Sequence, residues 1–420
     1  MKIIFNLSLI MTSIWSSQTL AKVYSFDELL KLAKKNSIQI EIEKTKILEL
    51  RAKLKELKAD YYPKLSAVIG SERREARSEP EINETNLVGE VRLEYNLFKF
   101  GANSQKAKAL VTLIDQHTKN FDYHTLKLRR ELKEIFYELS YFIKYKRLLN
   151  DELEYNQKLY KQVSFKKRQG LVGAADTLEF KMRKANLTGL VLSSDAKIQK
   201  LSDEIKKLTL LEEIDFSIRE DLPHEHFSVK LSDLKKSAKL KNNKLLRRQS
   251  KVSSALHALD GSRADRLPSL DLQGRYGKMR IDEQYANDSL EGVVGVFLTI
   301  PLFDGGANSS KVDLKKAQYA RERLKLNRLQ KELNLDVESR LLNMQNIHKN
   351  VDLAQESVEN SEAYFKIVYS EYSRGIKNSL DLVSARNQIL DFKTNFLKYK
   401  RDYLIAKLKL EEAAGANFDQ

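Results

Sequence analysis

The chain has 420 residues, contains no cysteine and carries a formal net charge of +16 at pH 7. The lack of cysteine excludes disulfides, thiolate metal sites, a cysteine nucleophile and a lipid attached to an N-terminal cysteine. Lysine and arginine number 74, but 58 acidic residues are mixed with them, which favours a solvated helical surface over one nucleic-acid-binding patch. The low content of proline and glycine, 5 and 15 residues, suits long helices.

The first 21 residues have the layout of a secretory signal peptide. Lys2 precedes an apolar run from Ile3 to Trp15, and Ala21 closes the segment with a small side chain. The run is too short to span a bilayer, and no longer apolar run follows it. We expect residues 1–21 to be removed on export; a short N-terminal anchor is the alternative. An exported chain of this kind that crosses a membrane must do so as a closed β-barrel.

The next segment predicts a helix that is interrupted once and ends at a proline. Ser25 and Glu28 have the spacing of a capping box, and the helix is expected to break near Asn36. Pro63 lacks an amide donor and disfavours the helical conformation of the residue before it, so the helix should end there.

Alternation with a period of two then predicts a β-hairpin over residues 64–97, and a second one over residues 269–302. In the clearest stretch, apolar residues from Val91 to Leu97 alternate with polar residues from Glu90 to Asn96. This pattern is typical of a strand with lipid on one side and water on the other, although a half-buried soluble strand has the same pattern. Four strands cannot close a barrel, which needs about eight or more. Identical subunits should therefore pool their strands, and two or three copies both satisfy this requirement.

Each hairpin ends in the same corner, which indicates an internal duplication. The motif Leu-Phe-x-x-Gly-Ala-Asn-Ser contains Phe98 and Gly101 in the first copy, and Phe303 and Gly306 in the second. The same offset of about 205 residues separates Pro63 from Pro268, Gly170 from Gly375, and Asp176 from Asp381. A constant offset over such a distance predicts a repeated structural unit.

After each corner, more than sixty residues lack proline and glycine, which predicts a helix of about 100 Å at about 1.5 Å per residue. Apolar residues spaced alternately three and four apart predict a coiled-coil seam in both helices. The seam residues of the first helix are Leu132, Phe136, Leu139, Leu149, Leu153, Tyr160 and Val163. Those of the second are Val337, Leu341, Met344, Ile347, Val351, Ala354, Val358, Phe365, Val368 and Tyr372. Gly170 and Gly375 should end these helices in a left-handed conformation, and Asp176 and Asp381 should cap the return helices.

The expected organisation is a signal peptide (1–21), a first repeat (22–210), a linker (211–231), a second repeat (232–414) and a C-terminal tail (415–420). The first helical hairpin should cover about 102–210, and the second about 307–414. His224 and His226 in the linker lack the spacing of a helical zinc site. Because no nucleophile elbow, phosphate loop or catalytic triad is present, we expect neither an enzyme nor a cofactor or metal.

These residues together resemble the TolC-type outer membrane efflux proteins, over essentially the whole mature chain. The motifs that carry the resemblance are Ala59-Asp60-Tyr61-Tyr62-Pro63-Lys64-Leu65, Pro301-Leu302-Phe303-Asp304-Gly305-Gly306, and the turns after Gly170 and Gly375. The resemblance implies a mainly α-helical fold with a membrane β-barrel: a homotrimer whose twelve strands, four per chain, are continued by an α-helical barrel with coiled-coil tips. It also implies a location in the outer membrane of a Gram-negative bacterium, extending into the periplasm.

The resemblance further implies a gate at the periplasmic end. Asp381 corresponds to an aspartate ring of the family, and Tyr372 to a tyrosine of the latch. Lys377 replaces an arginine, and Ser384 replaces a second ring aspartate, so the number of acidic rings stays open. The adaptor-docking tips would be Gly170, Leu171, Val172, Asp176, Gly375 and Ile376. The corners between barrel and helices would be Phe98, Gly101, Phe303, Gly306, Pro63 and Pro268.

The expected function is a passive exit duct of a tripartite efflux pump or a type I secretion system. Its partners would be two further copies of the chain, a periplasmic adaptor, an inner-membrane RND, MFS or ABC transporter, and outer-membrane lipid, with no nucleic acid. The alternatives are an exported coiled-coil adaptor, against which the paired amphipathic strands argue, and a basic exported scaffold without a pore.

Overall fold

The computed structural model describes residues 24–76, 82–211, 222–223, 229–278, 290–416 and 418. The predicted signal peptide, most of the predicted linker and both of its histidines lie outside these residues. No helix within the described ranges combines the length and the apolar character that crossing a membrane requires.

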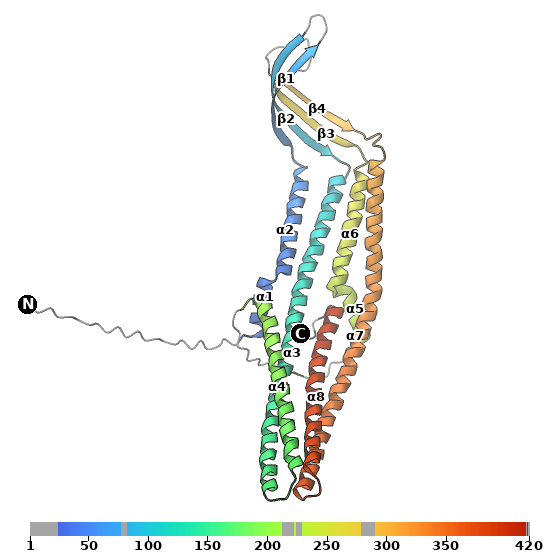
Figure 1. Cartoon of the computed structure of the whole chain (residues 1–420). Helices are drawn as coiled ribbons and strands as arrows, with labels where there is room; N and C mark the ends of the chain where they lie inside the picture. The colour runs from blue at the N-terminus through green and yellow to red at the C-terminus, as the bar shows by residue number, and fades with distance from the viewer. Residues whose placement is uncertain are drawn as a thin grey trace, which may run out of the picture. The chain divides into compact units, whose positions relative to one another are not determined.

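The described helices and strands occur in the same order in both halves of the chain (Figure 1). The first half contains α1 (Phe26–Asn36), α2 (Ile38–Ala59), β1 (Lys64–Ala76), β2 (Ile82–Phe98), α3 (Ala102–Arg168) and α4 (Ala174–Thr209). The second contains α5 (Leu231–Lys241), α6 (Asn243–Ala264), β3 (Ser269–Lys278), β4 (Glu291–Thr299), α7 (Ala307–Ser373) and α8 (Ser379–Ala414). The long helices α3 and α7 have 67 residues each, and α4 and α8 have 36 each. The duplication predicted from the corners therefore extends to every described helix.

The two repeats are not two domains. The chain forms two compact units, and each takes equivalent parts of both repeats. The unit that we call the hairpin unit contains α1, α4, most of α8 and the C-terminal parts of α3 and α7. The other, the sheet unit, contains the four strands, α2, α5, α6 and the N-terminal parts of α3 and α7.

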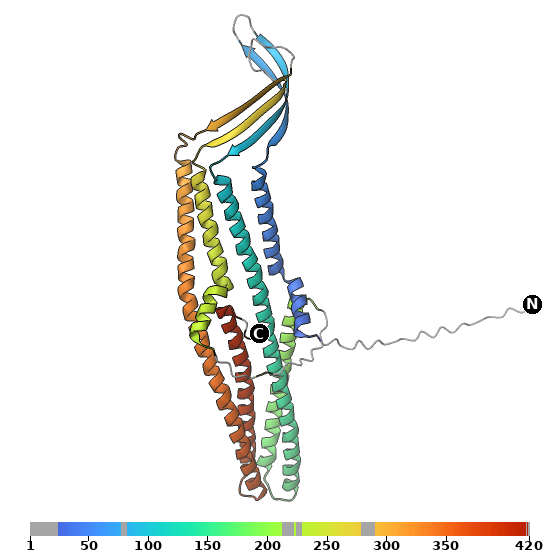
Figure 2. The ribbon, with the colours of Figure 1, turned by 180° about the vertical axis from the view of Figure 1, so that it is seen from behind.

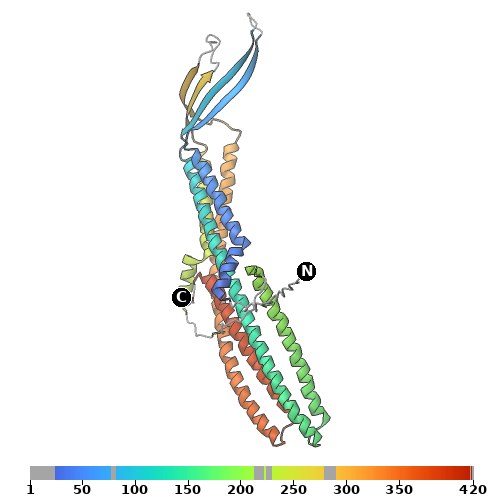
Figure 3. The same ribbon diagram turned by 90° about the vertical axis from the view of Figure 1, so that its left-hand side faces the viewer.

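The sheet unit holds one antiparallel sheet in the order β1-β2-β3-β4 (Figures 1 and 3). Leu65 pairs with Leu93 inside the first hairpin, and Leu272 pairs with Val296 inside the second. The two repeats meet where Val91 on β2 pairs with Tyr276 on β3. Among the described residues, β1 and β4 each pair on one side only, so the sheet has two open edges.

One face of the outer strand β4 carries an uncovered apolar row. Val294, Val296 and Leu298 alternate along β4, Ile300 follows directly after the strand, and all four are exposed, Val294 to 74%. On the opposite edge strand, Ile69 is 86% exposed. An isolated sheet of four strands in water would bury one face, so this row indicates a further apolar surrounding or partner.

All four connections between strands and helices lie at the same end of the sheet (Figure 2). Pro63 follows α2 and Pro268 follows α6, as predicted, and each is the last residue of a short corner, directly before a strand. The capping box at the start of α1 also forms: the Ser25 amide donates to a Glu28 carboxylate oxygen over 2.9 Å, and the Glu28 amide donates to Ser25 Oγ.

In the hairpin unit, the predicted seams form the core. Leu132, Phe136 and Leu139 of α3 pack with Leu29 and Ile205 in one cluster. A second cluster joins Val163 of α3, Val368 and Tyr372 of α7, and Leu382 of α8. The coiled-coil prediction is thus confirmed, and the turns that join α3 to α4 and α7 to α8 lie beside each other (Figures 1 and 2).

Candidate functional site

The two helix-ending turns have the predicted left-handed glycines. Gly170 has a φ of 76° and Gly375 a φ of 79°. In both turns, two backbone hydrogen bonds close the helix end: Leu171 donates to the Lys166 carbonyl, and Ile376 donates to the Glu371 carbonyl, with a second bond from each glycine. This geometry needs positive φ, which explains why glycine occupies both positions.

Both predicted aspartates bond to the start of their return helices, but each does so as the third helical residue, because α4 begins at Ala174 and α8 at Ser379 and the residues before them are Gly173 and Asn378. Asp176 Oδ2 accepts from the Gly173 amide over 3.0 Å, and Asp381 Oδ2 accepts from the Asn378 amide over 3.1 Å. The Asp381 amide in turn donates to Asn378 Oδ1. In the single chain, Asp381 therefore acts as a helix cap, which is the structural role that the same residue type has in the first repeat.

The four predicted gate residues have different surroundings. Tyr372 is buried in the cluster around Leu382, and its ring lies 4.4 Å from Lys166 Nζ. Within the described chain, its hydroxyl is buried without a hydrogen-bond partner. Lys377 and Asp381 are half-buried, and Ser384 is exposed. The chain alone brings Tyr372 close to α3 but does not gather the four side chains into one cluster.

The predicted docking turns expose apolar side chains. Leu171 is 69% exposed and Ile376 is 65% exposed, whereas Val172 packs against the buried cluster that contains Tyr372. The exposed set continues onto the return helices with Leu178, Met182 and Leu380. Uncovered leucine and isoleucine at adjacent turns form an apolar surface suited to a protein partner.

Further along α3, α4 and α8 from these turns, the hairpin unit contains a buried charged cluster that the sequence analysis missed. Glu152 on α3 is 2% exposed and accepts from Arg183 Nη2 on α4 over 2.9 Å and from Arg386 Nε on α8 over 3.2 Å. Arg183 Nε also donates to Asn387 Oδ1 over 3.0 Å. The Arg386 guanidinium lies 4.1 Å from the ring centre of Tyr155. The cluster thereby joins α3, α4 and α8.

The charges of this cluster do not cancel: one carboxylate faces two guanidiniums. Burial lowers the pKa of Arg183 from its ordinary value, and the attraction of Glu152 opposes that effect. Arg183 Nη1 and the nearby Asn156 Oδ1 are buried without a partner in the described residues. Removal of Glu152 would therefore leave buried positive charge without its counter-charge.

A signal for this cluster was present in the sequence. In α3 the buried positions Leu149, Glu152, Asn156, Leu159 and Val163 are spaced alternately three and four apart. Arg183 occupies the same kind of position in α4, between Phe180 and Leu187. Charged residues at seam positions mark buried polar contacts, but only the fold shows that these particular residues meet.

The corners between strands and helices differ between the repeats. Gly101 and Gly306 both have positive φ, 85° and 86°. The residue before them is Phe100 in the first repeat and Gly305 in the second, and both have positive φ as well. Phe98 and Phe303 are exposed, at 53% and 91%, so these corners present aromatic side chains outward.

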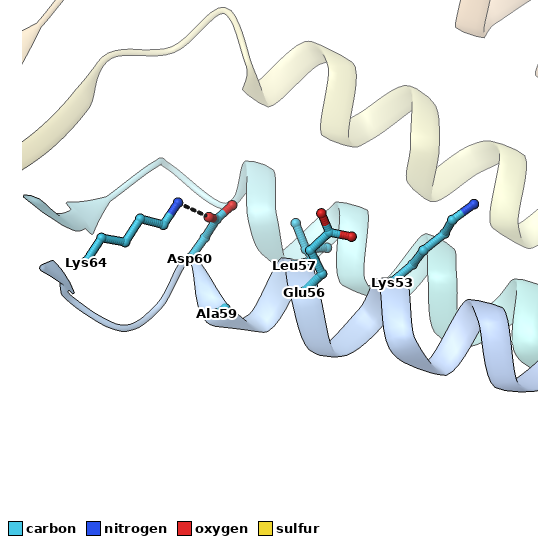
Figure 4. Close-up of a pocket in the computed structure, with 6 residues that line it drawn as sticks. All are labelled: Lys53, Glu56, Leu57, Ala59, Asp60 and Lys64. Atoms are coloured by element: carbon cyan, nitrogen blue, oxygen red, sulfur yellow. Dashed lines mark hydrogen bonds and ion pairs between the residues drawn. The ribbon is translucent and has the colours of Figure 1, made fainter. Parts of the chain in front are cut away.

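The α2–β1 corner also contains a shallow pocket, shown in Figure 4. Its lining residues are Lys53, Glu56, Leu57, Ala59, Asp60 and Lys64. Lys64 Nζ donates to Asp60 Oδ1 over 2.8 Å, and this hydrogen bond holds the pKa of Asp60 below its ordinary value. The ion pair fastens the corner between α2 and β1. No group of metal-ligating side chains occurs elsewhere in the described chain.

The comparisons with known proteins agree with this architecture. Residues 234–416 match the family model described as outer membrane efflux protein. This match agrees with the resemblance stated from the sequence. No curated protein matches the chain.

Solved structures match over nearly the whole chain. The CmeC outer membrane channel of Campylobacter jejuni is 16% identical, with a TM-score of 0.78 over 93% of this chain and 85% of its own. The outer membrane protein VceC of Vibrio cholerae is 15% identical, with a TM-score of 0.79 over 94% and 96%. The open state of the MtrE outer membrane channel of Neisseria gonorrhoeae is 17% identical, with a TM-score of 0.76 over 93% and 89%. At this identity the matches show the fold, which is the mainly helical fold with an antiparallel sheet that the sequence predicted.

Proposed function

We propose that this chain, which carries an outer membrane efflux protein domain over residues 234–416, is one of three identical subunits of a passive exit channel in the outer membrane. The observation that carries the proposal is the sheet: four strands, two open edges and an uncovered apolar row. Three copies joined edge to edge give twelve strands, enough to enclose a lumen, and turn the apolar row toward lipid.

The proposed three-subunit barrel also implies where the strands and the helices would lie in the cell. The strands would lie in the outer membrane of a Gram-negative bacterium, and the helices would continue the channel in the periplasm. The exposed aromatic side chains at the corners, Phe98 and Phe303, suit the boundary between lipid and water. The folds of CmeC and MtrE, both described as outer membrane channels, support this placement.

The channel would be closed at the helical turns and opened by a partner. Three copies of Asp381 around a threefold axis would attract cations and repel one another, and Lys377 would offset part of that charge. Tyr372 would hold the α7–α8 hairpin against α3, and Ser384 would line the narrowed passage. The exposed turns at Leu171 and Ile376 would bind a periplasmic adaptor that draws the hairpins apart.

Energy for transport would come from elsewhere. The sequence has no nucleotide-binding motif, so an inner-membrane transporter of the RND, MFS or ABC class would drive efflux or type I secretion. The alternative of a basic exported scaffold predicts a different behaviour: high salt would release a scaffold held by charge, whereas a barrel would need detergent.

The decisive experiment is ion conduction by the detergent-purified protein in planar bilayers. Asp381→Ala should reduce cation selectivity and block by divalent cations. Asp176→Ala is the matched control, because it removes the same kind of helix cap from the first repeat without touching the proposed ring. Equal effects of both variants would remove Asp381 from the gate, and a protein without conductance that elutes with salt would contradict the channel itself.

A further inference from the structure

Basic residues gather where the strands of the sheet unit join its helices. The four corners and their flanking turns cover residues 58–64, 97–108, 263–269 and 300–316, and the corners lie at one end of the sheet (Figure 2). These ranges contain ten lysines and arginines but four acidic residues. The whole chain has 74 basic and 58 acidic residues, so its excess of positive charge is concentrated at the corners.

Three of the four acidic residues in these ranges are already engaged. Asp60 accepts from Lys64 over 2.8 Å, and Asp265 accepts from Lys106 over 2.6 Å, so each neutralises one lysine. Asp304 accepts from two backbone amides at the entry to α7, over 3.0 and 2.9 Å. Most of the cations at the corners are therefore left without an acidic partner in the described chain.

Each corner combines such a cation with a large apolar side chain in contact with water. The four cations, one from each corner, are Lys58, Lys99, Arg266 and Lys311. Lys99 is half-buried, and the other three are exposed. The apolar side chains, in the same order, are Tyr62, Phe98, Leu267 and Phe303, and all four are exposed.

Cations of neighbouring corners also lie close together. The hydrogen bond from Lys64 lowers the pKa of Asp60 most, but the charges of Lys99 and Lys106 lower it further. Lys99 and Lys106 belong to the β2–α3 corner, whereas Asp60 belongs to the α2–β1 corner. The two corners of the first repeat thus present one continuous basic surface.

Along the chain, the apolar surface of β4 ends where this charge begins. The exposed row continues past the strand through Ile300 to Leu302 and Phe303, which are both 91% exposed. Lys311 is the fifth residue of α7 and lies about 6 Å along that helix, at about 1.5 Å per residue. The headgroup layer of a bilayer has about the same depth, since headgroups thicken a core of about 30 Å to about 40–45 Å. A membrane that covers the apolar row would place its headgroups at the level of Lys311.

An anionic phospholipid matches both parts of this surface. Its glycerol and upper acyl chain suit aromatic and leucine side chains, which are favoured at the boundary between lipid and water. Its phosphate suits lysine and arginine, each of which adds to the attraction of a nearby anionic membrane surface. A soluble anion would use the cations but would leave the exposed apolar side chains uncovered.

We propose that the four corners form a collar, centred on Lys58, Lys99, Arg266 and Lys311, that binds the headgroups of anionic phospholipids in the leaflet next to the helices. The collar rests on the proposed function, because it meets headgroups only if the sheet lies in a membrane. It adds a preference for one class of lipid, which a barrel by itself does not require.

The tryptophan content of the chain allows a local test. The single tryptophan, Trp15, lies in the predicted signal peptide. In a chain with Trp15→Phe, Phe303→Trp places one fluorescent reporter at the β4–α7 corner. The full-length protein is reconstituted into vesicles of phosphatidylcholine and phosphatidylglycerol, with one lipid brominated at a time. Bromine quenches a tryptophan that touches the brominated lipid, so the two quenching curves give the lipid preference at the corner.

At low salt, the reporter should prefer phosphatidylglycerol over phosphatidylcholine by about three- to tenfold. The preference should fall toward one in about 0.5 M sodium chloride, because salt screens exposed charges. Lys311→Gln should remove most of it. Lys331→Gln is the matched control, because Lys331 is also an exposed lysine of α7 without an acidic partner in the described chain. It lies about 30 Å further along the helix.

The outcomes separate the collar from the channel. Equal quenching by both lipids at low salt would overturn the collar and leave the proposed channel intact. A reporter that neither lipid quenches would overturn both, because the corner would then not lie at a membrane. Displacement of phosphatidylglycerol by inorganic phosphate, at an ionic strength matched with chloride, would assign the cations to a soluble anion instead.

A combined variant tests the collar as a whole. It carries Lys58→Gln, Lys99→Gln, Arg266→Gln and Lys311→Gln, and it should show no lipid preference at the reporter. Its conductance in planar bilayers of phosphatidylcholine should persist, which shows that the variant is folded. A preference that survives in this conducting variant, or that Lys331→Gln reduces as much as Lys311→Gln does, would mean that the overall charge of the chain and not the collar attracts the lipid.

Discussion

The two repeats have the same helices but hold them with different polar contacts, and the difference is largest in the buried charges. Glu152 and Arg183 of the first repeat meet inside the hairpin unit. The residues at the equivalent positions of the second repeat are Ser357 and Gln388. The helix periodicity survived duplication because it needs only apolar seams, whereas each charged contact needs two partners and was free to diverge. A shared fold therefore does not imply shared stabilising contacts.

The largest expected effect is at the buried cluster. Glu152→Ala should destabilise the protein by about 3–5 kcal/mol, because it leaves Arg183 and Arg386 buried without their shared carboxylate. Ser357→Ala, at the equivalent position of the second repeat, should change stability by less than about 0.5 kcal/mol. Thermal unfolding followed by circular dichroism measures both.

A second pair of variants sharpens the interpretation of that cluster. Replacing Glu152 and Arg183 together by leucine should recover part of the loss, because it removes one of the two guanidiniums that Glu152→Ala leaves without a carboxylate, and only Arg386 then remains unpaired. Glu152→Ala with a melting temperature equal to that of Ser357→Ala would show that the cluster contributes no stability.

The next effect concerns the junctions between the short helices. Asn242 caps α6 by accepting from the Leu245 amide over 3.1 Å, and it also donates to the Ala413 carbonyl over 2.9 Å. In the first repeat these tasks are divided: Ser37 caps α2, and Asn36 donates to the Thr209 carbonyl over 2.6 Å. We expect Asn242→Ala to cost about 2–3 kcal/mol and Asn36→Ala about 1 kcal/mol.

Denaturant unfolding of both variants, with Ser37→Ala as the third, checks this division of tasks. The losses from Asn36→Ala and Ser37→Ala should add to about the loss from Asn242→Ala. Equal losses from the two asparagine variants would contradict it.

Most of the architecture could be predicted from the sequence, but the polar contacts could not. Pro63, Gly170 and Gly375 determine the local geometry through their own backbone. The helix ends at these residues could therefore be predicted without knowing which other residues they contact. The pairing of Glu152 with Arg386 depends on which helices meet, and the two residues are far apart in sequence. The role of the proposed gate residues is harder still to predict from the sequence, because Asp381 would act in a gate only when three chains come together.

The pH dependence of stability should differ between the repeats as well. Burial acts to raise the pKa of Glu322, but Lys251, Lys325 and Arg248 outweigh it and hold that pKa below its ordinary value. A lowered carboxyl pKa contributes stability that is present above about pH 4.5 and is lost as the pH falls below it. Glu322→Gln should therefore cost about 1–2 kcal/mol at pH 7 and progressively less below pH 4.

Unfolding of Glu322→Gln and the natural chain at pH 7 and pH 3.5 measures this convergence. Glu332→Gln is the matched control, because Glu332 also pairs with an arginine, Arg328, but its side chain is 54% exposed. That variant should differ little from the natural chain at either pH. A constant difference for Glu322→Gln at both pH values would show that the loss is one of packing and not of charge.

The smallest expected effect is at the corners that lead into the long helices. Gly305 has a φ of 64° and no atom within 4 Å of the position that a Cβ would take, so Gly305→Ala changes only the backbone energy. It should cost about 1 kcal/mol, the ordinary penalty for a left-handed residue with a side chain.

Phe100 already bears this penalty with a φ of 44°, and its ring contacts that of Phe98 at 4.7 Å. Phe100→Gly relieves the backbone but loses the ring contact, so its net effect should stay within about 1 kcal/mol of zero. The two variants compared by denaturant unfolding test whether the aromatic contact compensates for the unfavourable backbone in the first repeat. A large loss from Phe100→Gly would mean that the aromatic pair, and not the turn, determines the corner.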